Sequence, residues 1–197
     1  MAERGPRNFD PVAVGNRECD AWIAYYRHEW RRFLVAAVGM VSAGFGVNPA
    51  RTLQGAWLVL RANQVWAPYP DNDPDRAREL MQRFYRLVRT EGELSLDLVE
   101  AARREVQWWH IHRVHQREAD LSEEDLVVAL VDLYSYVYQA DPDTVRLAAT
   151  LRVLAMRLSD EWGEAGADAA SPILRDERRA LVASYAALRE AVDRAGS

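Results

Sequence analysis

The sequence predicts an all-α fold, a single-domain bundle of about seven helices in which neighbouring helices pack mostly antiparallel. Apolar residues recur at three- and four-residue steps over most of the chain, which is typical of amphipathic helices. Helix-start signals precede most of these segments, and the connections between them are mostly short. No segment alternates between apolar and polar residues as a half-buried strand does.

The N-terminus lacks this periodic pattern. Residues 1–17 are polar and carry scattered Gly, Pro and Asn, so we predict a mobile N-terminal arm there and a helical domain over residues 18–197. The first helix is expected to begin near Cys19 and to continue as one apolar face up to Val41. It is expected to end among the glycines that follow, of which Gly44 is the first.

Most of the remaining helices are predicted from their cap residues. Asn, Asp and Ser side chains accept hydrogen bonds from the free N–H groups of a first helical turn, and proline fits the position behind them. An acidic residue three positions after a serine completes a capping box. The expected cap residues are Asn48, Asp73, Ser95, Ser122, Asp141 and Ser171. The corresponding helices are expected to reach about Gln64, Val88, Glu118, Val137, Trp162 and Val192.

Large apolar side chains indicate which helix faces form the core. The most regular stripe runs along the sixth predicted helix and consists of Leu147, Leu151, Leu154, Leu158 and Trp162. Tryptophans on other apolar stripes are expected to be mostly buried, namely Trp22, Trp30, Trp57 and Trp109. These faces are therefore predicted to meet in one core.

Composition limits the classes of function. The formal net charge is -5 and the pI is near 5.5, which argues against a nucleic-acid-binding protein because such proteins need a concentrated basic face. The uncharged apolar segment 33–47 is shorter than the roughly 20 residues of a membrane span, so no membrane association is expected. Cys19 is the single cysteine, and the first residues lack the apolar core of a signal peptide. We therefore expect a cytoplasmic protein, and the absence of lysine among its 25 basic residues is typical of a GC-rich bacterial genome.

The segment 105–115 concentrates imidazole side chains. Three of the four histidines lie here, next to two adjacent tryptophans, on the fourth predicted helix. At about 100° per residue, His110 lies near the predicted core face, whereas Glu105, His112 and His115 share a second stripe. A carboxylate and two imidazoles at helical spacing suit a metal site to which facing helices add ligands. The alternative is a polar flank in which these side chains bond to their neighbours or to water.

Glu29 is predicted to lie on the otherwise apolar face of the first helix. A buried carboxylate is costly unless it is paired, so it needs an arginine, a histidine or a metal ion nearby. Candidate partners on other helices are Arg61, His110 and His112. A histidine partner would bring Glu29 to the fourth predicted helix.

The first functional hypothesis is a non-enzymatic helical binding or protein-interaction module. The sequence lacks the local patterns of a nucleophile elbow, a phosphate-binding glycine loop or a dinucleotide fold. It holds seven tryptophans and eight tyrosines, more than one small core readily buries. We therefore expect a homodimer, or a partner of another protein, with an aromatic-lined pocket between helices or an aromatic-lined surface. The candidate ligand-binding residues are Tyr26, Glu29, Trp109, His110, Tyr134 and Tyr138.

The second hypothesis is an iron- or haem-dependent oxidoreductase. Its site would combine Glu29 with Glu105, His112 and His115, and His110 is a further candidate. The repeated Glu-x-x-His spacing of carboxylate-bridged di-iron bundles is absent, so such a site requires a different ligand set. The sequence favours no cofactor, and iron or haem belongs only to this alternative.

Overall fold

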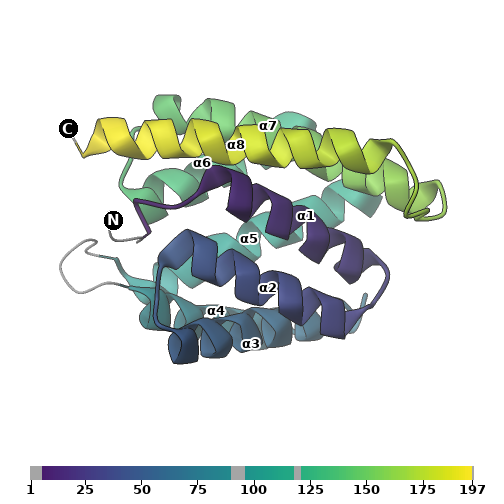
Figure 1. Cartoon of the computed structure of the whole chain (residues 1–197), viewed down its shortest axis with the longest axis horizontal. Helices are drawn as coiled ribbons and strands as arrows, with labels where there is room; N and C mark the ends of the chain where they lie inside the picture. The colour runs from purple at the N-terminus through teal and green to yellow at the C-terminus, as the bar shows by residue number, and fades with distance from the viewer. Residues whose placement is uncertain (1–5, 90–95, 118–120, 197) are drawn as a thin grey trace.

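Helices make up most of the structure. The computed structural model describes residues 6–89, 96–117 and 121–196. Within these residues it contains eight helices and no strand, which confirms the predicted all-α single-domain bundle (Figure 1). The helices are α1 (Pro11–Tyr26), α2 (Trp30–Phe45), α3 (Pro49–Trp66), α4 (Pro74–Val88), α5 (Leu98–Arg117), α6 (Glu123–Tyr138), α7 (Pro142–Glu164) and α8 (Ile173–Ala195). In the described part of the chain, none of them combines the length and the apolar character that crossing a bilayer requires.

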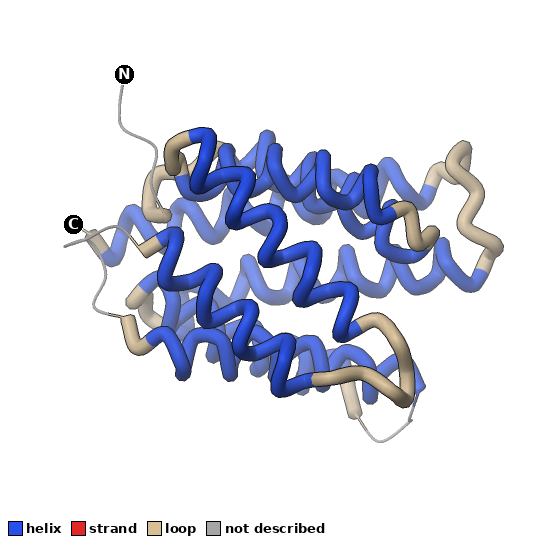
Figure 2. The backbone as a smooth tube through the Cα atoms, turned by 90° about the horizontal axis from the view of Figure 1, so that it is seen from below, coloured by secondary structure: helices blue, strands red, loops and turns tan. Residues whose placement is uncertain are grey.

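The helices form a closed ring. Each packs mainly against its neighbours in sequence, from α1 on α2 through to α7 on α8, and α8 packs back on α1. Figure 1 shows α6, α7 and α8 on one side, α2, α3 and α4 on the other, and α1 and α5 between the two groups. Figure 2 shows that the loops lie mostly at the two ends of the bundle. A ring of this kind directs one stripe of each helix toward a common interior.

The predicted cap residues explain where most helices begin. Ser122 and Asp125 form the predicted capping box at the start of α6. Ser171 Oγ accepts a hydrogen bond from the N–H of Ile173 at the start of α8. Ser95 lies outside the described residues. The predicted caps that accept backbone hydrogen bonds and are followed by a proline are Asn48, Asp73 and Asp141.

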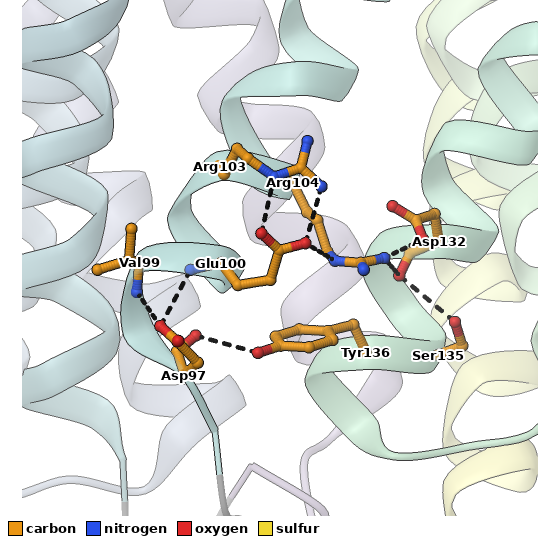
Figure 3. A network of polar contacts seen from close by, with 8 residues as sticks. All are labelled: Asp97, Val99, Glu100, Arg103, Arg104, Asp132, Ser135 and Tyr136. Atoms are coloured by element: carbon orange, nitrogen blue, oxygen red, sulfur yellow. Dashed lines mark hydrogen bonds and ion pairs between the residues drawn. The ribbon is translucent and has the colours of Figure 1, made fainter.

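A polar network starts α5 and holds it to α6 (Figure 3). Asp97 Oδ1 accepts hydrogen bonds from two N–H groups of the first turn of α5. Arg104 donates to Glu100 at 2.8 Å and to Asp132 on α6, and its guanidinium carbon lies 4.5 Å from the ring centre of Tyr136. Partly exposed ion pairs contribute little to stability, so the network mainly sets how α5 lies against α6.

The first predicted helix is two helices, which is why the bundle has eight helices. α1 ends at Tyr26 and α2 begins at Trp30. Between them His28 has a φ of 55°, and the N–H of Glu29 donates to the carbonyl of Ala24 at 2.8 Å. The turn lets α1 pack on α8 and α2 pack on α3. One continuous helix was predicted because the apolar spacing runs on across the break.

α1 begins at Pro11, earlier than predicted. Asp10 Oδ1 accepts hydrogen bonds from two N–H groups of its first turn, each at 3.0 Å. Phe9 is only 4% exposed, and its ring centre lies 6.0 Å from that of Tyr185. The predicted arm of residues 1–17 is therefore corrected from Pro6 onward, and the residues before it lie outside the described part of the chain.

We expect Phe9→Ala to lower the free energy of unfolding by about 3 kcal/mol, because truncating a buried phenylalanine removes aromatic contacts and leaves a cavity. Urea denaturation measures this loss. Val12→Ala is the matched control, since Val12 is 57% exposed on the same segment. Equal costs for the two variants would contradict the docking of this segment on the core.

Burial of the tryptophans is correctly predicted only in part. Trp109 is buried and Trp22 and Trp30 are partly buried, but Trp57 is 53% exposed. Its neighbour Ala56 is fully buried instead. The packed face of α3 is therefore rotated from the predicted one, and the prediction for Trp57 is wrong.

On α7 the predicted leucine stripe is not the most buried face. Leu147 is 61% exposed, whereas Ala148 and Ala149 are fully buried. α7 packs against both α6 and α8, and small side chains let neighbouring helices approach closely on both sides. The same buried face contains one charged residue, Arg152.

Candidate functional site

The interior of the ring contains a cavity of about 410 Å³. This volume falls within the range of about 300–1,000 Å³ that is typical of small-molecule sites. All eight helices contribute side chains to its wall, so segments far apart in the sequence meet there. The wall is rich in aromatic rings and includes all four phenylalanines of the chain, Phe9, Phe33, Phe45 and Phe84.

An ion pair between α1 and α7 lies in this wall. Arg152 Nη2 donates to Glu18 Oε1, and the two residues are buried, at 9% and 4% exposure. Arg152 Nη1 donates to the hydroxyl oxygens of Tyr134 at 2.9 Å and of Tyr185 at 3.4 Å. The guanidinium carbon also lies 5.1 Å from the ring centre of Trp108, a cation–π contact. Side chains from four other helices therefore hold Arg152 in place.

Two polar atoms of this pair have no hydrogen-bond partner among the described residues, Arg152 Nε and Glu18 Oε2. Burial opposes the charge of the guanidinium, yet the carboxylate of Glu18 and the hydroxyls of Tyr134 and Tyr185 raise the pKa of Arg152 well above its usual value. Arg152 is therefore positively charged. Both unpaired atoms are buried among the side chains that surround the pair.

Glu105 places a second carboxylate in the cavity wall. The hydroxyl of Tyr85 donates to its Oε2 at 2.7 Å, and Trp108 Nε1 donates to its Oε1 at 3.1 Å. Burial and the nearby Glu105 raise the pKa of Tyr85 well above its usual value, so that hydroxyl stays protonated. Both oxygens of Glu105 therefore have partners, whereas Glu18 has one only at Oε1.

Asp160 on α7 joins side chains of α1 and α5 at the edge of the cavity. The Tyr26 hydroxyl and the Gln116 amide donate to its Oδ1, and His112 Nε2 lies 3.1 Å from its Oδ2. Burial acts to raise the pKa of Asp160, but these hydrogen bonds lower it overall. Tyr26, His112 and Gln116 line both the cavity and a neighbouring groove. We call it the polar groove because its lining also includes His115, Arg157 and Glu164. Asp160 and its three partners therefore lie between the cavity and the polar groove.

Two arginines of α5 contact aromatic rings, some of which line the cavity. Arg113 Nη2 donates to the hydroxyl of Tyr25 at 3.1 Å, and its guanidinium carbon lies 5.6 Å from the ring centres of Trp66 and Tyr69. The guanidinium carbon of Arg117 lies 4.1 Å from the ring centre of Tyr69. Both arginines line the cavity. Their cation–π contacts fix the orientation of the two cationic groups.

Comparisons with protein-family models, with curated proteins and with solved structures found no match. No activity, ligand or partner is therefore transferred to this chain from another protein.

The cavity brings together part of the predicted ligand-binding set. Four of its members line the cavity, Tyr26, Trp109, Tyr134 and Tyr138. Glu105 and His112, assigned to metal binding from the sequence, line it as well. That these residues bind a ligand stays a prediction.

Glu29 does not line the cavity. It lies in the turn between α1 and α2, where it pairs with Arg27 Nε at 3.1 Å and with Arg32 Nη1 at 2.8 Å. The prediction of a partner on another helix is therefore wrong. The helix break is the physical reason, because it removes Glu29 from the apolar face on which it was placed.

The predicted metal ligands do not converge. His110 is exposed, His112 is bonded to Asp160, and His115 lines the polar groove. Within the described residues, no group of three or more His, Cys, Asp or Glu side chains is placed to hold a metal ion. The prediction that His110 faces the core is wrong because the buried face of α5 is rotated, which leaves Val99 62% exposed.

Sequence reasoning missed the pair of Glu18 and Arg152. Glu18 directly follows the predicted arm, at the first position of the predicted helical domain, and Arg152 follows Leu151 of the predicted leucine stripe. One signal was present. Arg152 lies three to four positions from Ala148, Ala149 and other small or apolar residues, a spacing that predicts a shared buried face.

Proposed function

We propose that the protein is a non-enzymatic binding protein that holds a small, largely apolar molecule inside its ring of helices. The observation that carries the proposal is the aromatic cavity with a buried ion pair in its wall. Buried charges are costly when their hydrogen-bonding capacity is left unused, and cavities lower stability. A binding role gives a reason for both features.

The hydroxyl groups of the cavity are suited to hydrogen bonding. Burial raises the pKa values of Tyr25, Tyr26, Tyr134 and Tyr138, so these hydroxyls are protonated near neutral pH. A protonated phenol donates and accepts hydrogen bonds and does not act as a base. These hydroxyls can therefore hydrogen-bond to a bound molecule without carrying a charge.

The alternative, an iron- or haem-dependent oxidoreductase, has less support. Its ligand set is divided between a helix–helix turn, which holds Glu29, the cavity wall, which holds Glu105 and His112, and the polar groove, which holds His115. Among the described residues, these side chains do not form a group that could hold one metal ion. A binding role does not require these side chains to converge on one point.

A homodimer, or a complex with another protein, stays a prediction. Val35 on α2 and Leu53 and Trp57 on α3 are each more than half exposed, which is unusual for large apolar side chains. Light scattering after size exclusion measures the mass in solution. A monomeric mass at the highest concentration tested would contradict the homodimer.

The cavity is tested with N-phenylnaphthylamine, a neutral apolar dye that fluoresces more strongly away from water. Ala21 lines the cavity and is 3% exposed, so Ala21→Leu places extra methyl groups inside it. We expect this variant to bind the dye about tenfold more weakly than the wild type. Its melting temperature should stay the same or rise, because filling a cavity stabilises.

The matched control is Val12→Leu on the exposed face of the same helix, which should change neither dye binding nor melting temperature. Overpacking a filled core costs about 1–3 kcal/mol. A loss of that size in Ala21→Leu would contradict the cavity. Failure of the wild-type protein to bind the dye would contradict the proposed function.

A further inference from the structure

We infer that the cavity binds a single-chain anionic amphiphile, with its carboxylate at Arg113 and Arg117 and its hydrocarbon chain in the interior of the ring. The inference rests on the proposed function and names the chemical class of the ligand. It follows from where the cavity opens, from the charges at that opening and from the apolar wall behind it.

The cavity opens to solvent at one end of the bundle. Among the described residues that line it, the exposed ones are His28, Gln116 and Arg117. His28 lies in the turn after α1, and Gln116 and Arg117 are the last two residues of α5. Gln116 Nε2 donates to the hydroxyl of Tyr26 at 3.2 Å, so the ends of α1 and α5 lie together. We call this opening the mouth of the cavity, and one end of a bound molecule stays near water there.

Two guanidinium groups lie at the mouth. Arg113 and Arg117 are four positions apart on α5, so they share one face of the helix, and both line the cavity. Their guanidinium carbons contact the same ring, that of Tyr69, at 5.6 and 4.1 Å from its centre. The two positive charges are therefore held close to each other.

Both arginines have N–H groups that a ligand can reach. Among the described residues, neither Arg113 nor Arg117 has a carboxylate partner, whereas Arg103 on the same helix pairs with Glu100 at 2.7 Å. Arg113 donates from Nη2 to the hydroxyl of Tyr25, and none of its other nitrogens is among the buried atoms that lack a partner. Arg117 is exposed. The remaining N–H groups are therefore accessible.

The paired charges favour an anion at the mouth. Like charges four positions apart destabilise a helix. The negative end of the helix dipole favours each cation singly but does not remove their mutual repulsion. A carboxylate next to two guanidinium groups offsets that repulsion and accepts charge-assisted hydrogen bonds. A neutral group would leave the repulsion in place, and an ammonium group would add a third positive charge.

The carboxylates of the protein are engaged elsewhere. Asp160 lines the polar groove, and both of its oxygens have partners on α1 or α5. Glu18 lies eight positions before Tyr26 on α1, and Glu105 lies eight positions before Arg113 on α5. Each is therefore about 12 Å along its helix axis from the mouth. The positive charge of the mouth is thus separated from the acidic side chains of the cavity wall.

The interior selects a hydrocarbon chain. Phe33, Met81, Phe84 and Leu133 line the cavity and are buried. Polar atoms placed against these side chains would lose water without gaining a partner. The volume of about 410 Å³ lies toward the low end of the range for small-molecule sites, which suits one chain better than a two-chain lipid. The ligand therefore has one charged end and an apolar body.

Isothermal titration calorimetry of the full chain with three probes that share one alkyl chain tests the inference. The probes are decanoate, decanamide and decylamine. Decanamide matches decanoate in shape and lacks only its charge. At neutral pH we expect decanoate to bind at least about tenfold more tightly than decanamide, and decylamine to bind most weakly.

Variants of the two arginines assign this preference to the mouth. Arg113→Gln combined with Arg117→Gln should weaken decanoate binding by about tenfold and leave the binding of decanamide and of N-phenylnaphthylamine unchanged. Arg117→Gln alone, at an exposed position, should weaken decanoate binding by about threefold. Arg103→Gln is the matched control, since Arg103 is exposed on the same helix and does not line the cavity, and it should change no affinity.

A lipid bilayer also presents anionic head groups. The inference places the whole chain of a free amphiphile inside the cavity, so the protein should not sediment with vesicles of phosphatidylglycerol. Sedimentation with these vesicles in the absence of decanoate binding would overturn the inference, because the arginines would then contact a membrane surface.

Failure of all three probes and of the dye to bind would overturn the proposed function together with the inference. Binding of the dye and of decanamide, with decanoate no tighter than decanamide, would overturn the inferred ligand class and leave the proposed function standing. Tight decanoate binding that persists in the double variant would overturn the assignment to Arg113 and Arg117. The order of affinities in the wild-type protein decides the ligand class even if the double variant does not fold.

Discussion

Arg152→Met is expected to lower the free energy of unfolding by about 3–5 kcal/mol, because it leaves the buried carboxylate of Glu18 without its cation. The substitution also removes the donor to the hydroxyls of Tyr134 and Tyr185. Methionine keeps much of the length of the arginine side chain, so the loss reports the charge more than the packing. Urea denaturation followed by circular dichroism measures it.

Arg146→Met on the same helix is the matched control. Arg146 pairs with Glu124, and the two side chains are 48% and 59% exposed, so this loss should stay below about 1 kcal/mol. Adding Glu18→Met to Arg152→Met should recover most of the stability, since replacing both members of a buried pair by apolar groups is often neutral or stabilising. Equal costs for the two single arginine variants would show that Glu18 and Arg152 are solvated.

Features with a local chemical cause could be predicted from the sequence. Asp73 and Asp141 mark helix starts because the capping side chain and the N–H groups it satisfies are close in the chain. The break at His28 could not be predicted in this way. No glycine or proline marks it, and the apolar spacing continues on both sides. Packing of α1 on α8 and of α2 on α3 becomes evident only in the folded ring.

In the candidate site, too, local spacing predicts some features and long-range packing determines others. Tyr134 and Tyr138 could be assigned to one face because they lie four positions apart on a helix. The contact between Glu18 and Arg152 joins residues 134 positions apart. It depends on the return of α8 to α1 and on the rotation of α7 that turns Arg152 inward. No local spacing encodes either arrangement, so the polar centre of the cavity could not be predicted.

Glu177 is expected to make the protein less stable as the pH rises. Its side chain on α8 is 0% exposed, and neither carboxylate oxygen has a hydrogen-bond partner among the described residues that meets ordinary geometry. Burial raises the pKa of Glu177 from 4.5 to about 7. The carboxyl group is therefore protonated in the folded protein at pH values where the unfolded chain has already released its proton.

The sign of the effect follows from this difference. The pKa in the folded state lies above the value in the unfolded state, so the contribution is fully present below pH 4.5 and is lost as the pH rises through about 7. A pKa shift of this size corresponds to about 3 kcal/mol. The free energy of unfolding should decline by about that amount across this window, apart from the contributions of other titrating groups.

Glu177→Gln isolates this contribution, because glutamine keeps the shape of the protonated side chain and does not titrate. We expect the variant to match the wild type near pH 4 and to exceed its free energy of unfolding by about 3 kcal/mol near pH 8. Glu190→Gln is the control on the same helix, since Glu190 is exposed and should leave the pH dependence unchanged. Urea denaturation at a series of pH values measures all three proteins. Parallel curves for Glu177→Gln and the wild type would mean that the Glu177 carboxyl group ionises as readily in the folded protein as in the unfolded chain.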